Sequence, residues 1–203
     1  MSPTRTTLRT TGVAVRAMLV FTVVLGLGYT FLLVGIGRLA LPDQADGSLV
    51  RSADGQVIGS RLIGQSFTDA QGAALPQYFQ SRPSAAGDGY DGGASSGSNL
   101  GPNNDDLLAA IAERRAAVAA LEGVDEARVP ADAVTASASG LDPHISVAYA
   151  ELQAPRVARE RGLTASRVDE LVAAHTTGRD LGFLGEPRVD VLALNLALDA
   201  EGR

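Results

Sequence analysis

Hydrophobic and polar positions divide the chain into an apolar N-terminal segment, several amphipathic segments and a long stretch rich in Gly and Ser. Residues 17–37 form an uncharged run, AMLVFTVVLGLGYTFLLVGIG. At about 1.5 Å per residue, such a helix crosses a hydrocarbon core of roughly 30 Å. A cleaved signal peptide has a shorter apolar region, of about 7–15 residues, and a small-residue cleavage site. The pattern therefore favours a retained transmembrane helix over 17–37.

Charges on either side of this span predict its orientation. Three Arg precede the span, and only Arg38 follows it before the first acidic residues. Positive residues flanking a span usually stay on the cytoplasmic side. We therefore expect residues 1–16 in the cytoplasm and residues 41–203 outside, on a single-pass protein of the cell membrane.

Glycines within the span suggest a packing surface. Gly28 and Gly35 share one face of the helix, and Gly26 and Gly37 share roughly the opposite face. Small residues let a neighbouring membrane helix approach closely, although Gly is also simply tolerated in such helices. Both interpretations stay open.

The pattern after the span predicts one α+β domain over 41–203, with a small antiparallel sheet. Helical spacing, caps and breakers place helices at 105–121, 143–153, 155–162 and 164–175. Asn103 or Asn104 caps the first of these helices, and Asp142 caps the second. Pro155 is expected to break the second helix and to begin the third.

Strands are expected in three places. A hairpin at 48–64 turns at Asp54-Gly55, and residues 129–139 are small and β-branched. Leucines at every second position of 188–199 predict a terminal strand, which we expect to pair with the hairpin. Residues 67–79 are mixed and end in a short helix at 76–79.

Residues 81–104 hold six Gly, five Ser, three Asn and two Pro, the composition of a flexible linker. A structureless run of this length inside a compact domain is usually functional or disordered. It matches a dinucleotide-binding pattern at 87–92 and a hydrolase nucleophile pattern at 93–97. Neither match has the strand–turn–helix context that gives its glycines a purpose, so we expect neither site.

Composition excludes several kinds of chemistry. The chain has no Cys, and all 17 basic residues are Arg, which excludes thiolate and lysine chemistry. Residues 41–203 carry 13 Arg against 23 acidic residues, a net charge of −10, so nucleic acid is not an expected partner. His144 and His175 are the only imidazoles, and no metal site is expected from them.

Ser139, Asp142 and His144 are the residue types of a catalytic triad. They lie within six residues on a single turn, which cannot easily align hydroxyl, imidazole and carboxylate. A capping and structural role is favoured, and no catalytic residue is expected. A membrane-anchored serine hydrolase using Ser95 or Ser139 remains the weaker alternative.

Five motifs carry a family resemblance: YFQSRPSAAG (78–87), SSGSNLGPNN (95–104), VTASASGLDPHIS (134–146), QAPRVARERGL (153–163) and HTTGRDLGFLGEPRVDVLALNLALD (175–199). In this order they resemble the KdpC family, the C subunits of the bacterial Kdp potassium-importing ATPase. The resemblance covers almost the whole chain beyond the span. Asp190 departs from the family's usual Asn.

The resemblance implies a non-catalytic accessory subunit that binds no cofactor of its own. Its implied partners are the channel-like subunit KdpA, the ATPase subunit KdpB, the small subunit KdpF and the lipid bilayer. Potassium is the transported ion, and ATP is used by KdpB. The family is described as a catalytic chaperone that raises the ATP affinity of KdpB. ATP is cytoplasmic and this domain is expected outside, so indirect coupling and a cap over the potassium entrance stay open beside direct binding of ATP by this chain.

Candidate residues for subunit contact follow from the motifs. The first set is Ser81, Arg82, Pro83, Ser84, Ser98, Asn99 and Gly101, and the second is Ser139, Asp142 and His144. Arg82 is the best candidate for a charged contact, because a guanidinium pairs with a carboxylate through two hydrogen bonds. The alternative is that these groups satisfy local turns. We expect the loop 81–104 to be ordered by the domain or by a partner.

Overall fold

The computed structural model describes residues 3–52 and 54–201. The chain divides into two compact units, residues 1–49 and 50–203. The expected cytoplasmic segment 1–16 is described from residue 3. The expected domain 41–203 is described apart from residues 53, 202 and 203.

The first unit is one long helix followed by a short one. Helix α1 (Pro3–Phe21) continues through the π-helical η1 (Thr22–Tyr29) into α2 (Thr30–Ala40), and α3 (Pro42–Ala45) follows. The stretch from Thr7 to Ala40 has a mean hydropathy of 2.3 in its most apolar part and is long enough to cross a membrane. The predicted helix over 17–37 is confirmed, and it begins earlier than its uncharged part.

Glycines in this helix meet little of the chain itself. A Cβ added at Gly35 would have nothing within 4 Å, and one at Gly26 or Gly37 would make an ordinary contact at 3.9 Å. At Gly28 the nearest atom would be 3.6 Å away. Intrachain packing therefore does not require these glycines, and packing against a partner helix stays a prediction.

The expected hairpin is present. Strands β1 (Leu49–Arg51) and β2 (Val57–Ser60) form a two-stranded sheet, and Gly55 between them has a φ of +83°. The predicted pairing with a C-terminal strand is wrong, because these two strands form their own sheet among the described residues.

A second, antiparallel sheet contains β3 (His144–Ser146), β4 (Thr176–Thr177) and β5 (Arg188–Asp190) in the order β3-β5-β4. Ile145 and Thr176 both pair with Val189, on opposite sides of the central strand. Val189 is fully buried. The predicted α+β class with a small antiparallel sheet is confirmed, although other segments form the sheet.

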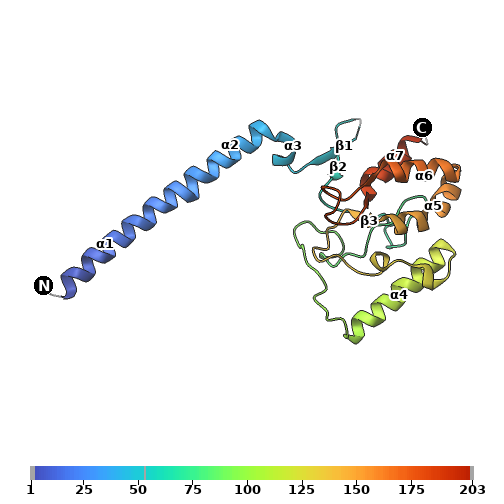
Figure 1. Cartoon of the computed structure of the whole chain (residues 1–203), viewed down its shortest axis with the longest axis horizontal. Helices are drawn as coiled ribbons and strands as arrows, with labels where there is room; N and C mark the ends of the chain where they lie inside the picture. Colours follow the sequence, from blue (N-terminus) through green and yellow to red (C-terminus); the bar gives the residue numbers. More distant parts are fainter. Residues whose placement is uncertain (1–2, 53, 202–203) are drawn as a thin grey trace. The chain divides into compact units, whose positions relative to one another are not determined.

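Four helices surround the core: α4 (Asp105–Glu122), α5 (Val147–Arg161), α6 (Ala165–Ala174) and α7 (Val191–Glu201). Figure 1 shows α5, α6 and α7 gathered together and α4 beside them. The predicted helices at 105–121 and 164–175 are confirmed, with Asn104 and Thr164 as their N-caps. Leu108 of α4 is 51% exposed.

The predicted terminal strand is wrong beyond residue 190, where helix α7 begins. Four of its five buried residues, Val191, Leu194, Asn195 and Leu198, follow helical spacing, and Leu192 is the fifth. Nearly every residue from 191 to 198 is apolar, so the sequence fits both the two-residue period of a strand and the 3.6-residue period of a helix. Asp190 decides the outcome, because its carboxylate accepts a hydrogen bond from the Ala193 N–H at 2.9 Å, as a helix cap does.

Helix α5 also differs from the prediction. It begins at Val147 with Ser146 as its cap, and it runs through Pro155 to Arg161. Pro155 removes a hydrogen bond to the carbonyl of Glu151, and both residues are exposed, so water can satisfy that carbonyl. Asp142 caps no helix, and its carboxylate accepts the His144 N–H at 3.0 Å.

Two further segments turn where regular structure was expected. The predicted strand 129–139 is wrong, because the chain forms the 3₁₀ helices η2 (Glu126–Arg128) and η3 (Ala131–Ala133) on either side of Pro130. Thr135 reinforces the second turn by donating its hydroxyl to the Ala131 carbonyl at 2.7 Å. The predicted helix 76–79 is a single turn, in which the Tyr78 N–H bonds the Leu75 carbonyl.

Candidate functional site

The Gly/Ser-rich stretch has no helix or strand, yet hydrogen bonds hold its first part against the domain. Ser96 N–H donates to the Ser139 carbonyl at 2.9 Å, and the Ser84 hydroxyl donates to the Gly140 carbonyl at 2.6 Å. The Tyr90 hydroxyl closes the loop on itself by donating to the Arg82 carbonyl at 2.7 Å. We expected this loop to be ordered by the domain or by a partner, and its first part is held by the domain.

Small residues allow this close approach of two backbones. A Cβ at Gly140 would lie 2.6 Å from the Ser96 carbonyl oxygen, and Gly140 also has a φ of +68°. A Cβ at Gly97 would lie 2.8 Å from the Ala138 carbonyl oxygen. These distances are shorter than van der Waals contact, so only glycine fits at either place.

The glycines of the dinucleotide-like match belong to a turn. Gly87 and Gly89 have φ values of +54° and +111°, and Tyr90, which follows Gly89, has a φ of +56°. The Tyr90 N–H donates to the Ser84 hydroxyl at 2.8 Å. These glycines shape a reversal of the chain that turns the Tyr90 ring inward.

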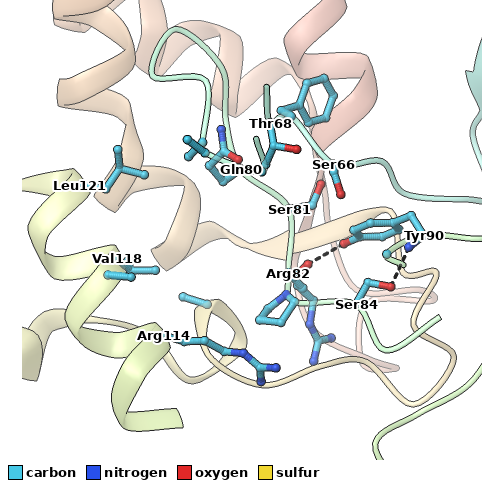
Figure 2. Close-up of a pocket in the computed structure, with 18 of the residues that line it drawn as sticks. Ser66, Thr68, Gln80, Ser81, Arg82, Ser84, Tyr90, Arg114, Val118 and Leu121 are labelled. Atoms are coloured by element: carbon cyan, nitrogen blue, oxygen red, sulfur yellow. Dashed lines mark hydrogen bonds between the residues drawn. The ribbon is translucent and has the colours of Figure 1, made fainter. Parts of the chain in front are cut away.

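A cavity of about 700 Å³ lies beside this turn. Figure 2 shows residues 80–84 along one wall and the α4 side chains Arg114, Val118 and Leu121 along the other. Tyr90 covers one end of the cavity. All four residues of the predicted Ser81–Ser84 contact set line it. A volume of this size holds a small molecule or a few side chains of a partner.

Two guanidinium groups, those of Arg82 and Arg114, line the cavity. Arg82 donates to the Thr135 carbonyl at 3.3 Å, and Arg114 donates to the adjacent Val134 carbonyl at 3.2 Å. Arg82 also pairs with Asp142 at 2.9 Å. Within the described part of the chain, Arg114 has no carboxylate within 4.0 Å, and the buried Arg82 Nε has no hydrogen-bond partner. Among the described residues, Asp88 is the one acidic residue that lines the cavity.

Asp142 is the carboxylate that both Arg82 and His144 contact. Burial alone would raise the pKa of its carboxyl, but hydrogen bonds from His144 and the charge of Arg82 outweigh burial and lower it. Burial raises the pKa of Tyr90 to about 12, so its hydroxyl stays protonated and continues to donate. Asp142 is therefore ionised and paired with Arg82 inside the chain.

The triad-like residues do not form a triad. His144 Nδ1 lies 3.4 Å from Asp142, but the Ser139 hydroxyl accepts the Leu141 N–H at 3.1 Å. Among residues 3–52 and 54–201, no hydrogen bond joins Ser139 to His144. The same described residues contain no cluster of three His, Asp or Glu able to hold a metal ion.

Other predicted contact residues lie elsewhere. Ser98, Asn99 and Gly101 are exposed and do not line the cavity. Asn99 has a φ of +54°, a conformation that Asn tolerates better than most residues. The structure brings Ser81–Ser84 together with Asp142 and leaves the 98–101 segment apart on the surface.

Buried amides that sequence reasoning missed fix the cavity wall. Asn195 of α7 donates to the Phe79 carbonyl and accepts the Phe79 N–H, both at 2.9 Å. Gln153 of α5 bonds the N–H and carbonyl of Gln80 in the same way, at 2.6 and 3.1 Å. The sequence signal that could have indicated these contacts is a polar residue within an apolar run, such as Asn195 within residues 191–198.

A buried ion pair supports the same segment. Arg156 lies 3.0 Å from Glu122, and the two side chains are 2% and 0% exposed. Arg156 also donates to the carbonyls of Pro76 and Tyr78. Burial raises the pKa of Glu122, and Arg156 opposes that rise. The backbone leading into the cavity is thus held by helices α4, α5 and α7.

Comparisons with known proteins agree on one family. The profile described as "KdpC: K+-transporting ATPase, c chain" matches residues 11–200. A protein from Kineococcus radiotolerans named potassium-transporting ATPase KdpC subunit is 58% identical over 181 residues, covering 89% of this chain and 88% of its own. Proteins of the same name from Beijerinckia indica and Mycobacterium tuberculosis are 54% identical over 184 and 187 residues, covering 91% and 92% of this chain and 90% and 95% of their own.

These matches cover both the apolar helix and the domain that holds the cavity. They exclude the alternative of a serine hydrolase, in agreement with the geometry around Ser139. The chain therefore belongs to the KdpC family, the non-catalytic c subunits of the K⁺-transporting ATPase.

Proposed function

We propose that this chain assembles and stabilises the potassium-importing complex of KdpA, KdpB and KdpF, and raises the ATP affinity of KdpB. The family match over residues 11–200 is the observation that carries the proposal. One apolar helix anchors the chain, and we place the domain outside the membrane because three Arg precede the helix.

An outside domain raises ATP affinity by binding one state of the pump more tightly than another. Linkage is reciprocal, so a state stabilised by this chain and preferred by ATP becomes more populated. A tenfold gain in ATP affinity needs a difference of only about 1.4 kcal/mol in binding to the two states.

The experiment compares purified complex with and without this chain. We expect omission to abolish assembly or to raise the ATP concentration for half-maximal hydrolysis about tenfold or more. Unchanged uptake of potassium and an unchanged ATP dependence would overturn the proposal. Binding of labelled ATP to the full chain alone separates direct binding from indirect coupling.

A second function is favoured by the net charge of −10 on residues 41–203. An acidic domain outside the membrane would cap the entrance of KdpA and weakly concentrate potassium there. Salt screens such fields within about 8–10 Å, so the effect requires close contact with the entrance. Potassium affinity that changes on omission while ATP dependence stays constant would favour this cap.

Arg82 is proposed to contact a partner as well as Asp142. Replacing Arg82 with Ala removes both contacts, whereas Asp142→Asn keeps the Arg82 side chain and weakens the contacts of Asp142 within the chain, to Arg82 and His144. We expect Arg82→Ala to reduce co-purification of the complex more than Asp142→Asn does. Equal losses would mean that Arg82 serves the fold alone.

A further inference from the structure

The loop between β4 and β5 presents large apolar side chains to solvent. We define the apolar tip as Leu181, Phe183 and Leu184, which are 83%, 69% and 50% exposed. The loop leads back into Val189, which is fully buried at the centre of the sheet. Three adjoining large apolar residues at one loop end are unlike scattered exposed leucines, which need no explanation.

Backbone hydrogen bonds preorganise this loop. Asp180 and Leu184 exchange two hydrogen bonds, each of 2.9 Å, and the Gly182 N–H donates to the Arg179 carbonyl at 3.1 Å. Leu181 has a φ of +54°, a left-handed conformation that leucine rarely adopts. The loop thus keeps Leu181 outward by its backbone geometry, with no burial of that side chain in return.

Charged pairs surround the apolar tip. Arg179 bonds Glu186 at 2.6 Å, and Arg188 lies 3.5 Å from Asp180. The four charges sum to zero. An apolar centre within a polar rim is the usual anatomy of a protein–protein contact.

We propose that the apolar tip inserts into a concave apolar pocket on another protein subunit of the ATPase complex. This inference rests on the proposed function, because it assigns the contact by which the domain joins the complex. Three side chains are too few for a stable interface, which buries about 800 Å² on each partner. The apolar N-terminal helix compensates for the small contact area, because anchoring in the same membrane raises the local concentration of this chain around its partner.

A protein pocket fits the tip better than a lipid surface does. Membrane-binding surfaces are rich in Lys and Arg, which attract anionic headgroups. Here Asp180 and Glu186 flank the tip and cancel the two Arg. The chain also has its own apolar helix of 34 residues for anchoring.

Photocrosslinking in the assembled complex identifies the occupant. Benzoylphenylalanine replaces Phe183, and the same probe replaces Leu62 as the control, because Leu62 is equally exposed at 64% outside the tip. We expect a crosslink from position 183, and not from 62, to another subunit. A crosslink to lipid, to a second copy of this chain, or to nothing would overturn the inference.

Replacement of the tip gives a second measurement. In Leu181→Ser/Phe183→Ser we expect at least a tenfold faster loss of this chain from the purified complex than in Leu62→Ser. Equal rates of loss for the two variants would refute the proposed contact of the apolar tip, even if the unsubstituted chain supports potassium uptake and raises ATP affinity. Failure of the unsubstituted chain to join the complex would instead refute the proposed function.

Discussion

Two glycine-rich loops of this domain use their glycines in opposite ways. Residues 81–97 are polar, and hydrogen bonds from Ser84 and Ser96 hold them against the segment 139–140. Residues 178–187 carry the apolar tip, and their backbone hydrogen bonds join residues of the same loop. Glycine lets the first loop approach another backbone, and it lets the second project side chains away from the core. Similar composition thus serves inward packing in one place and outward display in the other.

The largest effect is expected where the first loop meets the domain. Gly140→Ala would place a Cβ 2.6 Å from the Ser96 oxygen at a φ of +68°. We expect a loss of about 2–4 kcal/mol in the free energy of unfolding, from steric overlap and backbone strain. Urea unfolding of the full chain in detergent measures it.

Gly123→Ala is the matched control, because Gly123 has a φ of +69° and nothing within 4 Å of an added Cβ. Its expected loss is about 1 kcal/mol, from conformation alone. Equal losses at the two positions would mean that the loop does not pack against Gly140.

A smaller effect is expected from the loop's internal hydrogen bond. Tyr90→Phe leaves the ring in place but removes the donor to the Arg82 carbonyl. We expect a loss of about 1 kcal/mol, because a typical hydrogen bond contributes that much. Thermal unfolding measures it, and Tyr29→Phe in the membrane helix is the control. A loss above about 3 kcal/mol would indicate a role for the hydroxyl beyond this bond.

The contacts of Asp142 with His144 and Arg82 make the first loop sensitive to acid. The pKa of Asp142 is lowered in the folded chain from its ordinary value of 3.8, so its stabilisation is complete above that value. It is lost as pH falls through the lowered pKa. We expect Asp142→Asn to be less stable than the unsubstituted chain at pH 7, and the gap to close below about pH 4. A gap that stays constant down to pH 2 would refute this assignment.

The smallest effect on stability is expected in the second loop. Phe183→Ser removes a side chain that is 69% exposed, so the free energy of unfolding should change by less than about 0.5 kcal/mol. A loss above about 1.5 kcal/mol would show that the apolar tip supports the fold and is not kept for a partner.

Sequence patterns predicted the elements whose signals are local. The long apolar helix, the hairpin at Gly55 and the cap at Asn104 are set by composition and by neighbours a few residues away. The strand predicted at 188–199 was wrong beyond residue 190, because the apolar run there fits two periods. Only the cap at Asp190 and burial by the core distinguish them.

The site was partly predictable for the same reason. The Ser81–Ser84 set was chosen from motifs, and these residues do line the cavity. Arg114 on the facing wall, and Gln153 and Asn195, which hold Gln80 and Phe79, lie far away in the sequence, so no local pattern connects them to the loop. Arg82 was expected to face a partner's carboxylate, and its observed carboxylate is Asp142, 60 residues later.

The amides of Gln153 and Asn195 also set the register of the chain beside the helices. Each amide occupies both backbone groups of one residue, Gln80 and Phe79 respectively. A slip of one residue would leave buried donors and acceptors without partners, at about 1–3 kcal/mol for each group. Residues 79 and 80 therefore have a single favourable register against helices α5 and α7. An insertion or deletion in the turns before Pro76 would change those turns and would leave the cavity wall in place.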